Sequence, residues 1–294
     1  MSRPLRLDAP GLFHHVMARG NNKMNIFLDD QDRTKFLAVL ASVVSRYALS
    51  CIAYCLMRNH YHLVVRTAIA NLSAAVRQLN GVYAQWWNYR HRRVGHVTQG
   101  RFKAQVIQEE GYLLQACRYV ALNPVRAGLV TGARDWTWSS YAATIGAVPP
   151  SPFLDCQVLL AHFGPPNETA RAMYERFVES PSPTGDSVGE ALRGDARIIG
   201  TNAFVESFAA RAAQAARQVP HRERQLGRPP LERLFATRMS EGFDNSIREA
   251  HDTHGYSFGE IGAHLRMADK TVRGLARRKP SKCRSSPLNA EIET

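Results

Sequence analysis

The amino-acid sequence predicts an α+β domain followed by a small all-α domain. Of the 294 residues, 45% are hydrophobic and 9% are aromatic, which is enough to build a packed core and excludes a wholly disordered chain. Segments with strand-type and helix-type periodicity alternate in the first part of the chain, whereas the segment over 226–280 has helical periodicity only. These two patterns are typical of different fold classes.

The first strand and the first helix are separated by a turn. A β-rich run over 12–18 predicts the strand, and Arg19-Gly20-Asn21-Asn22 is a turn signal. Asp29 or Asp30 can cap the helix, because a carboxylate accepts a hydrogen bond from a free amide of the first turn. The apolar residues that follow have helical spacing; they are Phe36, Leu37, Leu40, Val43, Val44 and Tyr47.

A hairpin and a long helix come next. Strands are predicted over Cys51–Met57 and His60–Arg66, and Arg58-Asn59 forms the tight turn between them. The helix begins at Asn71 or Ser73 and runs to about Tyr89.

The last strand completes a known topology. Arg101–Gln108 has strand character, so the element order is β-α-β-β-α-β. This order is the ferredoxin-like, split βαβ plan, an antiparallel sheet with two helices on one face. A further helix over 109–122 is appended to it, and we expect Asn123-Pro124 to end that helix because a proline disfavours helical geometry at the residue before it.

Composition divides the chain into four segments. We predict a first domain over 1–150, a helical connecting region over 151–225, a helix-turn-helix-like domain over 226–280 and a flexible tail over 281–294. Prolines are frequent in the connecting region. In the third segment, Ser257-Phe258-Gly259-Glu260 is a capping-box pattern, which predicts the start of a helix.

The net charge of +13 indicates a polyanionic partner, with nucleic acid favoured over a membrane. Residues 1–150 carry 18 Lys and Arg against 7 Asp and Glu, and no acidic residue occurs between Asp32 and Glu109. A surface without carboxylates suits a phosphate backbone. A metal ion held by this stretch must use His, Asn, Gln or backbone ligands, which argues against most three-carboxylate nuclease sites.

The cysteines and the apolar segments indicate a cytoplasmic protein. Five scattered cysteines do not form a disulfide framework, and Cys51 and Cys55 are better interpreted as buried apolar residues than as half of a zinc site. No signal peptide is evident at the N-terminus. The apolar stretch over 36–57 contains Arg46 near its middle and changes period, so a buried helix followed by a buried strand fits better than a membrane span.

Two pairs of polar residues are candidates for chemistry. His60 and His62 are two apart on a predicted strand, so their side chains lie on one face and can converge on one metal ion. Taken alone, the pair is weak evidence, and two ordinary polar-face histidines are the better interpretation. His14 and His15 are adjacent and face opposite sides of their strand. Tyr119 and Asn123 are four apart on a predicted helix and share a face.

Several strings in this order resemble the IS200-type (Y1) tyrosine transposases, and among them the REP-associated tyrosine transposases. The two longest are Tyr54-Cys55-Leu56-Met57-Arg58-Asn59-His60-Tyr61-His62-Leu63 and Tyr119-Val120-Ala121-Leu122-Asn123-Pro124-Val125-Arg126-Ala127-Gly128-Leu129. The resemblance extends from about Phe13 to Gly146 and includes Gln99-Gly100-Arg101-Phe102-Lys103 and Trp138-Ser139-Ser140-Tyr141. Thr98 departs from it, since relatives often have an aromatic residue there.

The resemblance implies a metal-dependent transposase. His60 and His62 would bind Mg²⁺ or Mn²⁺, Asn123 would complete the metal site, and Tyr119 would attack single-stranded or hairpin DNA to form a 5′-phosphotyrosine. Two rivals stay open: a domesticated DNA-binding regulator that does not cut, and a replication-initiator or relaxase-like nickase. The sequence leaves the oligomeric state open between a monomer and a homodimer.

Basic and aromatic residues near the long helix are candidates for DNA binding, because bases stack on aromatic rings while cations neutralise phosphates. The alternative is that the aromatic residues form the core face of the helix. The candidates in the first domain are Arg77, Trp86, Trp87, Arg90, Arg92, Arg93, Arg101 and Lys103, and those on the predicted recognition helix are Lys270, Arg273 and Arg277.

Overall fold

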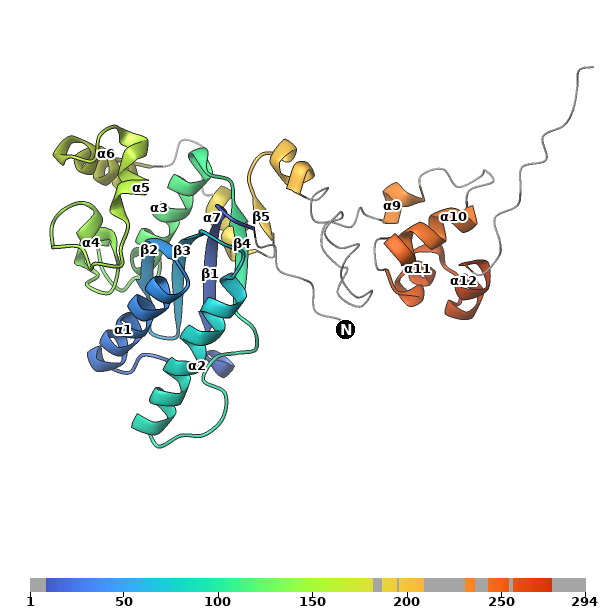
Figure 1. Cartoon of the computed structure of the whole chain (residues 1–294), viewed down its shortest axis with the longest axis horizontal. Coiled ribbons are helices and arrows are strands. Elements are labelled where there is room, and N and C mark those ends of the chain that lie inside the picture. Colours follow the sequence, from blue (N-terminus) through green and yellow to red (C-terminus); the bar gives the residue numbers. More distant parts are fainter. Residues whose placement is uncertain are drawn as a thin grey trace, which may run out of the picture. The chain divides into compact units, whose positions relative to one another are not determined.

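The computed structural model describes residues 9–181, 187–194, 196–208, 231–235, 243–253 and 256–276. These residues fall into two compact units that divide between Val205 and Glu206. We describe each unit by itself (Figure 1). The predicted segment over 281–294 lies outside the described residues.

The first unit contains one five-stranded sheet with the strand order β2-β3-β1-β4-β5. The first four strands are antiparallel neighbours, as the split βαβ plan predicts. They span Phe13–Arg19 (β1), Leu49–Leu56 (β2), His60–Thr67 (β3) and Lys103–Ile107 (β4).

The fifth strand corrects the prediction of a purely antiparallel sheet. Strand β5 (Ile198–Ile199) pairs in parallel with β4 at Val106 and Ile107, so the sheet is mixed. Two residues are too short a run to show strand periodicity, which explains why the sequence pattern did not reveal it.

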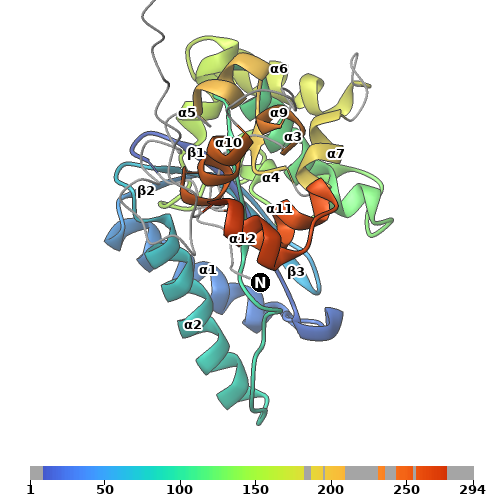
Figure 2. The ribbon, with the colours of Figure 1, turned by 90° about the vertical axis from the view of Figure 1, so that its right-hand side faces the viewer.

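Two long helices cover one face of the sheet and a third covers the other (Figures 1 and 2). Helices α1 (Asp30–Arg46) and α2 (Leu72–Arg90) share one core with Tyr61, Leu63 and Val65 of β3. Helix α3 (Glu110–Arg126) shares the second core with Val64. The alternation along β3 therefore sends His60 and His62 to the α3 face.

Helix α3 continues past the point at which we expected it to end. Pro124 lies inside the helix, which extends to Arg126 and is followed by Gly128 at a φ of 65°. Proline removes only one backbone donor, and Val120, Ala121 and Val125 pack this last part against the second core. The side chain of Asn123 also bonds to the helix, by donating from Nδ2 to the Tyr119 carbonyl oxygen at 2.9 Å.

Most of the predicted connecting region belongs to the first unit. Its helices are α5 (Cys156–Leu160), α6 (Glu168–Glu179) and α7 (Ser187–Arg193), and the shorter α4 (Tyr141–Thr144) precedes them. Residues of these helices, including Leu159, Tyr174 and Leu192, are buried in the core that α3 shares with the sheet. The helices of the predicted connecting region are therefore packed on the first domain and are not a separate linker.

Two segments cover the outer edge of β2. Ser139 and Leu154 form bridges to Cys55 and Cys51, and the Ser140 hydroxyl accepts a hydrogen bond from the Tyr54 amide at 2.9 Å. Covering an edge strand in this way protects its free backbone groups from pairing with another chain. Cys51 and Cys55 are fully buried free thiols, as predicted, and burial raises the pKa of Cys51 to about 12.

The described part of the second unit is helical. It contains α9 (Leu231–Leu234), α10 (Phe243–Arg248), a π-helical turn (Glu249–Thr253), α11 (Phe258–Leu265) and α12 (Asp269–Ala276). Ser257 and Glu260 form the predicted capping box. Arg266 ends α11 in the left-handed conformation with a φ of 55°, and a short turn leads into α12. Ile247, Ile261 and Val272 are fully buried between these helices.

No helix in the described ranges is both long and apolar enough to cross a membrane.

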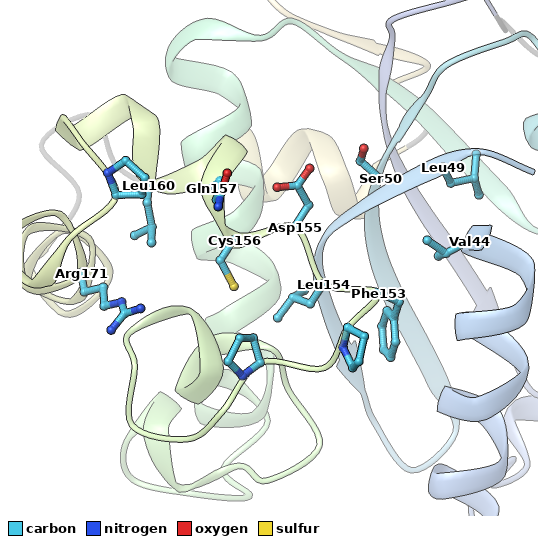
Figure 3. Close-up of a pocket in the computed structure, with 13 residues that line it drawn as sticks. Val44, Leu49, Ser50, Phe153, Leu154, Asp155, Cys156, Gln157, Leu160 and Arg171 are labelled. Atoms are coloured by element: carbon cyan, nitrogen blue, oxygen red, sulfur yellow. The ribbon is translucent and has the colours of Figure 1, made fainter.

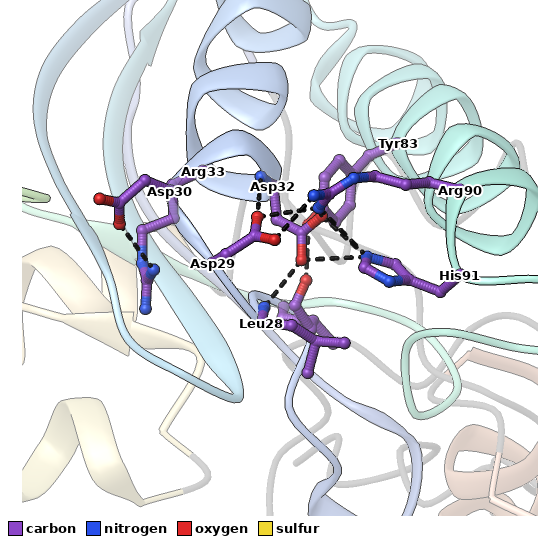
Figure 4. A network of polar contacts seen from close by, with 9 residues as sticks. Leu28, Asp29, Asp30, Asp32, Arg33, Tyr83, Arg90 and His91 are labelled. Carbon is purple, nitrogen blue, oxygen red and sulfur yellow. Dashed lines mark hydrogen bonds and ion pairs between the residues drawn. The ribbon is translucent and has the colours of Figure 1, made fainter.

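A buried carboxylate joins the start of α1 to the end of α2 (Figure 4). Asp32 has no exposed surface; its carboxylate accepts hydrogen bonds from the Leu28 amide at 2.7 Å, from Arg90 Nη1 and from His91 Nε2 at 2.9 Å. Arg90 also pairs with Asp29, which caps α1, at 2.7 Å. The network fixes where the basic loop after α2 begins.

We expect Asp32→Ala to destabilise the first unit by about 1–3 kcal/mol, because it leaves the Leu28 amide and the His91 ring without the buried carboxylate that accepts from them. Urea unfolding followed by tryptophan fluorescence measures this unit alone, since the four tryptophans (Trp86, Trp87, Trp136 and Trp138) all belong to it. Asp30→Ala is the matched control. The Asp30 side chain is 80% exposed, and its loss should cost less than about 0.5 kcal/mol. Equal effects of the two variants would contradict this account.

Candidate active site

The two histidines of the predicted metal site lie side by side on β3. Their ring centroids are 5.0 Å apart and the rings are nearly perpendicular. His62 is buried with 3% of its surface exposed, whereas His60 is half-buried and its Nδ1 lies 2.6 Å from the Asn59 side-chain oxygen. Tyr61 and Leu63 point into the opposite core, as the alternation of the strand predicts.

Helix α3 brings Tyr119 onto the same face. The Tyr119 ring meets the His62 ring edge-on, with centroids 5.6 Å apart. Tyr119 is buried, with 6% of its surface exposed. Two residues that are distant in the sequence, the predicted nucleophile and a predicted metal ligand, are therefore in contact.

The donor set fits a divalent metal. The Nε2 atom of His62 is buried and has no hydrogen-bond partner, which is the state of an imidazole nitrogen that awaits a ligand. Among the described residues no group of three or more His, Cys, Asp and Glu side chains is placed to hold a metal. A site here would thus need a ligand of another type, such as the predicted amide oxygen of Asn123.

A third histidine, which the sequence did not connect to this site, touches His62. His15 Nε2 lies 2.8 Å from His62 Nδ1, and the two rings stack with centroids 5.1 Å apart. His15 Nδ1 is 2.9 Å from Oε1 of Gln105 on β4. The signal for these two residues is the strand register, in which His15 is opposite Gln105 and two residues from the partner of His62.

Burial keeps the three imidazoles neutral at physiological pH. Desolvation lowers the pKa of His15 and of His60 to about 4, and it lowers the pKa of His62 well below 6.5. A neutral imidazole carries one N–H and one lone pair, so each ring offers a nitrogen that can accept a hydrogen bond or bind a metal.

Two arginines lie over the Tyr119 ring. The guanidinium carbon of Arg126 is 5.1 Å from the ring centroid, and that of Arg193 is 5.9 Å away. Arg126 is one turn of α3 beyond Asn123, and Arg193 ends α7. These cations place positive charge beside the Tyr119 ring.

The predicted DNA-binding residues around α2 separate into exposed and structural groups. Trp87 is 1% exposed and lies in the core, so it cannot stack on a base, and Trp86 is partly buried against that core. The alternative of a core-facing helix is therefore correct for Trp87. Arg90 is engaged by Asp29 and Asp32 (Figure 4). Arg77, Arg92, Arg93 and Arg101 are exposed.

The remaining predicted DNA-binding residues differ in their exposure and in their contacts. Lys103 donates from Nζ to backbone carbonyl oxygens of Arg193 and Gly194, which connects β4 to the end of α7. On α12, Lys270 is exposed, and Arg273 is exposed and pairs with Asp269 at 3.2 Å. Arg277 lies outside the described residues.

A cavity of about 490 Å³ lies between β2 and the segment that covers its edge (Figure 3). Its lining includes Ser50, Asp155, Cys156 and Arg171, and none of the predicted site residues contributes to it. The cavity is therefore separate from the histidines and Tyr119.

Comparisons with known proteins match the part of the chain that contains these residues. Residues 10–123, which include His60, His62, Tyr119 and Asn123, match the family model described as "Transposase IS200 like". The chain is 26% identical over 137 residues to a Haemophilus influenzae protein named as a REP-associated tyrosine transposase; the match covers 40% of this chain and 78% of the relative.

Two solved structures are also similar. One is a REP-associated tyrosine transposase bound to a REP hairpin, with 17% identity, a TM-score of 0.44 and coverage of 52% of this chain and 90% of that chain. The other is a protein of Deinococcus radiodurans R1 named as a transposase, with 14% identity, a TM-score of 0.30 and coverage of 43% and 92%. By sequence, residues 10–123 are therefore similar to the IS200-like transposase family.

Proposed function

We propose that this protein is a metal-dependent endonuclease and strand transferase that acts on single-stranded DNA through a covalent link to Tyr119. The observation that carries the proposal is the contact between the Tyr119 and His62 rings, whose centroids are 5.6 Å apart. A phenol beside a pair of neutral imidazoles provides a nucleophile next to a metal-binding face.

The reaction is a phosphoryl transfer that conserves bond energy. The Tyr119 oxygen loses its proton and bonds to phosphorus, while the bond from phosphorus to the 3′ oxygen breaks and that oxygen takes up a proton. The products are a 5′-phosphotyrosine and a free 3′-OH. Because a phenol with a pKa of about 10 is also a good leaving group, a DNA 3′-OH can reverse the step without ATP.

The residues that would hold Mg²⁺ or Mn²⁺ are His60, His62 and Asn123. The buried, unpartnered Nε2 of His62 supports this assignment, and Asn123 can present its amide oxygen because its Nδ2 is the atom that bonds to the helix. The metal supplies Lewis-acid polarisation of a phosphate oxygen when bound. The role of the chain's own residues is to keep the imidazoles neutral and to hold the phenol against them.

The two arginines over Tyr119 would bind the phosphate that it attacks. Only 6% of Tyr119 is exposed, so we expect Arg126 and Arg193 to move from the ring onto the DNA backbone when a strand enters. A guanidinium can bind a phosphate in a bidentate manner, which favours this exchange over a simple ring contact.

The substrate that we propose is single-stranded DNA next to a hairpin. The sequence resemblance and the relative named as a REP-associated tyrosine transposase support a repeat of this kind. The loop after α2, with Arg92 and Arg93 exposed, offers a surface for the strand. The helix-turn-helix-like pair α11 and α12 supports a second DNA contact through Lys270.

We expect Tyr119→Phe to abolish the covalent adduct while DNA binding is retained, because the variant loses only the hydroxyl. The measurement is a denaturing gel of the full chain after incubation with Mn²⁺ and a DNA hairpin labelled at its 3′ end, because the 3′ fragment is the part that stays linked to the tyrosine. Tyr89→Phe is the matched control, since Tyr89 is 86% exposed and outside the site. An adduct of normal yield in Tyr119→Phe would rule out Tyr119 as the nucleophile.

The double variant Arg92→Ala/Arg93→Ala should weaken binding to a fluorescent single strand and lower the salt dependence. Each lost phosphate contact removes about 0.7 from the slope of log affinity against log salt, so the expected change is about 1.4. Arg134→Ala is the control, since Arg134 is paired with Glu175. If the double variant has the same salt slope as the wild type, the loop after α2 does not contact the DNA backbone.

A further inference from the structure

The amide of Gln105 is held in one orientation by two backbone carbonyls. Its Nε2 donates to the carbonyl oxygens of Ala191 at 2.9 Å and Ala196 at 2.7 Å. Carbonyl oxygens only accept, so the nitrogen must face them and Oε1 must face the other way. Gln105 is 1% exposed, and water therefore does not compete for these bonds.

The orientation of Gln105 determines which nitrogen of His15 carries the proton. Oε1 of Gln105 is an acceptor 2.9 Å from His15 Nδ1, so the proton of the neutral imidazole lies on Nδ1. The other nitrogen, Nε2, then has a lone pair. His15 is 1% exposed, and this pair of hydrogen bonds accounts for both of its ring nitrogens.

The position of the proton on His15 in turn determines which nitrogen of His62 carries a proton. Its Nδ1 lies 2.8 Å from the His15 Nε2 lone pair, and only one of the two atoms can supply the proton of that bond. Since His15 has its proton on Nδ1, His62 Nδ1 is the donor. The lone pair of His62 is left on Nε2, the buried atom without a partner.

We propose that His15 and Gln105 are positioning residues that fix the tautomer of His62 and so present its Nε2 lone pair to the metal. This inference rests on the proposed function, in which His62 is a metal ligand. It adds residues beyond His60 and His62 of the strand, and it gives α7 and the segment after it a role in the site. That segment lies outside the residues 10–123 that match the family model.

The stacking geometry supports an orienting role. The His15 and His62 rings are nearly parallel, with 13° between their planes, so the hydrogen bond also limits rotation of the His62 ring. A ligating histidine whose second nitrogen donates to a fixed acceptor is a common arrangement in metal sites, and loss of such a partner typically reduces metal affinity by 10–100-fold.

The tautomer can be measured without metal or DNA. In the full chain labelled with ¹⁵N-histidine, two-dimensional ¹H–¹⁵N correlation spectra distinguish protonated from unprotonated ring nitrogens, and the His62 signals are identified by their loss in His62→Asn. The proposal predicts that His62 carries its proton on Nδ1 and none on Nε2. A proton on Nε2 of His62 in the wild type would overturn it.

Two variants test whether the His62 tautomer depends on the hydrogen-bonded chain from Gln105 through His15 to His62, which we call the relay. His15→Phe keeps an aromatic ring but removes the nitrogen that accepts from His62, and Gln105→Leu removes the group that orients His15. Both variants should give a mixture of His62 tautomers, and calorimetry should show a 10–100-fold weaker Mn²⁺ affinity. His15→Gln retains an acceptor oxygen and should restore most of the affinity. His14→Phe is the matched control, because His14 is on the same strand but faces the other core.

The outcomes separate this inference from the proposed function. If Gln105→Leu folds with a wild-type unfolding curve yet leaves the His62 tautomer and the Mn²⁺ affinity unchanged, the relay is wrong although cleavage through Tyr119 can stand. If the tautomers change as expected but the wild-type chain forms no adduct with DNA, the proposed function fails and the orienting contact remains. Because His15 and Gln105 are each replaced in a separate variant, Gln105→Leu still tests the relay if His15→Phe does not fold.

Discussion

The site depends on the register between β1 and β3. Met17 pairs with His62 and His15 pairs with Val64, so the side chains of His15, His60 and His62 all point to the α3 face. A slip of one residue between the strands would turn His15 to the face opposite His62, where Phe36 and Tyr83 fill the core. The many apolar residues that alternate along these strands fix the register, and one face that carries three neutral imidazoles is its consequence.

Helix α3 supplies the other half of the site under a similar constraint. Its apolar residues Val120 and Ala121 are packed in the second core, which sets the rotation of the helix and places Tyr119 against His15 and His62. Because this packing continues beyond Pro124, Arg126 is carried one turn further and reaches the Tyr119 ring. Residues after the segment that matches the family model complete the surroundings, since α7 brings Arg193 and one of the two carbonyls that orient Gln105.

The sequence was informative where a pattern is local. The alternation along His60–Leu63, the capping residues Asp29 and Ser257 and the apolar spacing of α1 predicted elements that the structure contains. It was uninformative where a partner is distant: nothing near His15 indicates a bond to His62, and nothing near Arg90 indicates that Asp29 and Asp32 engage it. Proline propensity also misled, because tertiary packing holds α3 together through Pro124.

The central claim is that one sheet face and one helix create a metal site beside a tyrosine. Anomalous diffraction from crystals of the full chain grown with Mn²⁺ tests it most directly, since it locates the ion without assuming its ligands. We predict a single strong peak that places the Mn²⁺ ion next to Nε2 of His62 and to His60, on the side of these rings that faces Tyr119. A peak elsewhere in the chain, or none at these histidines at saturating Mn²⁺, would contradict the account.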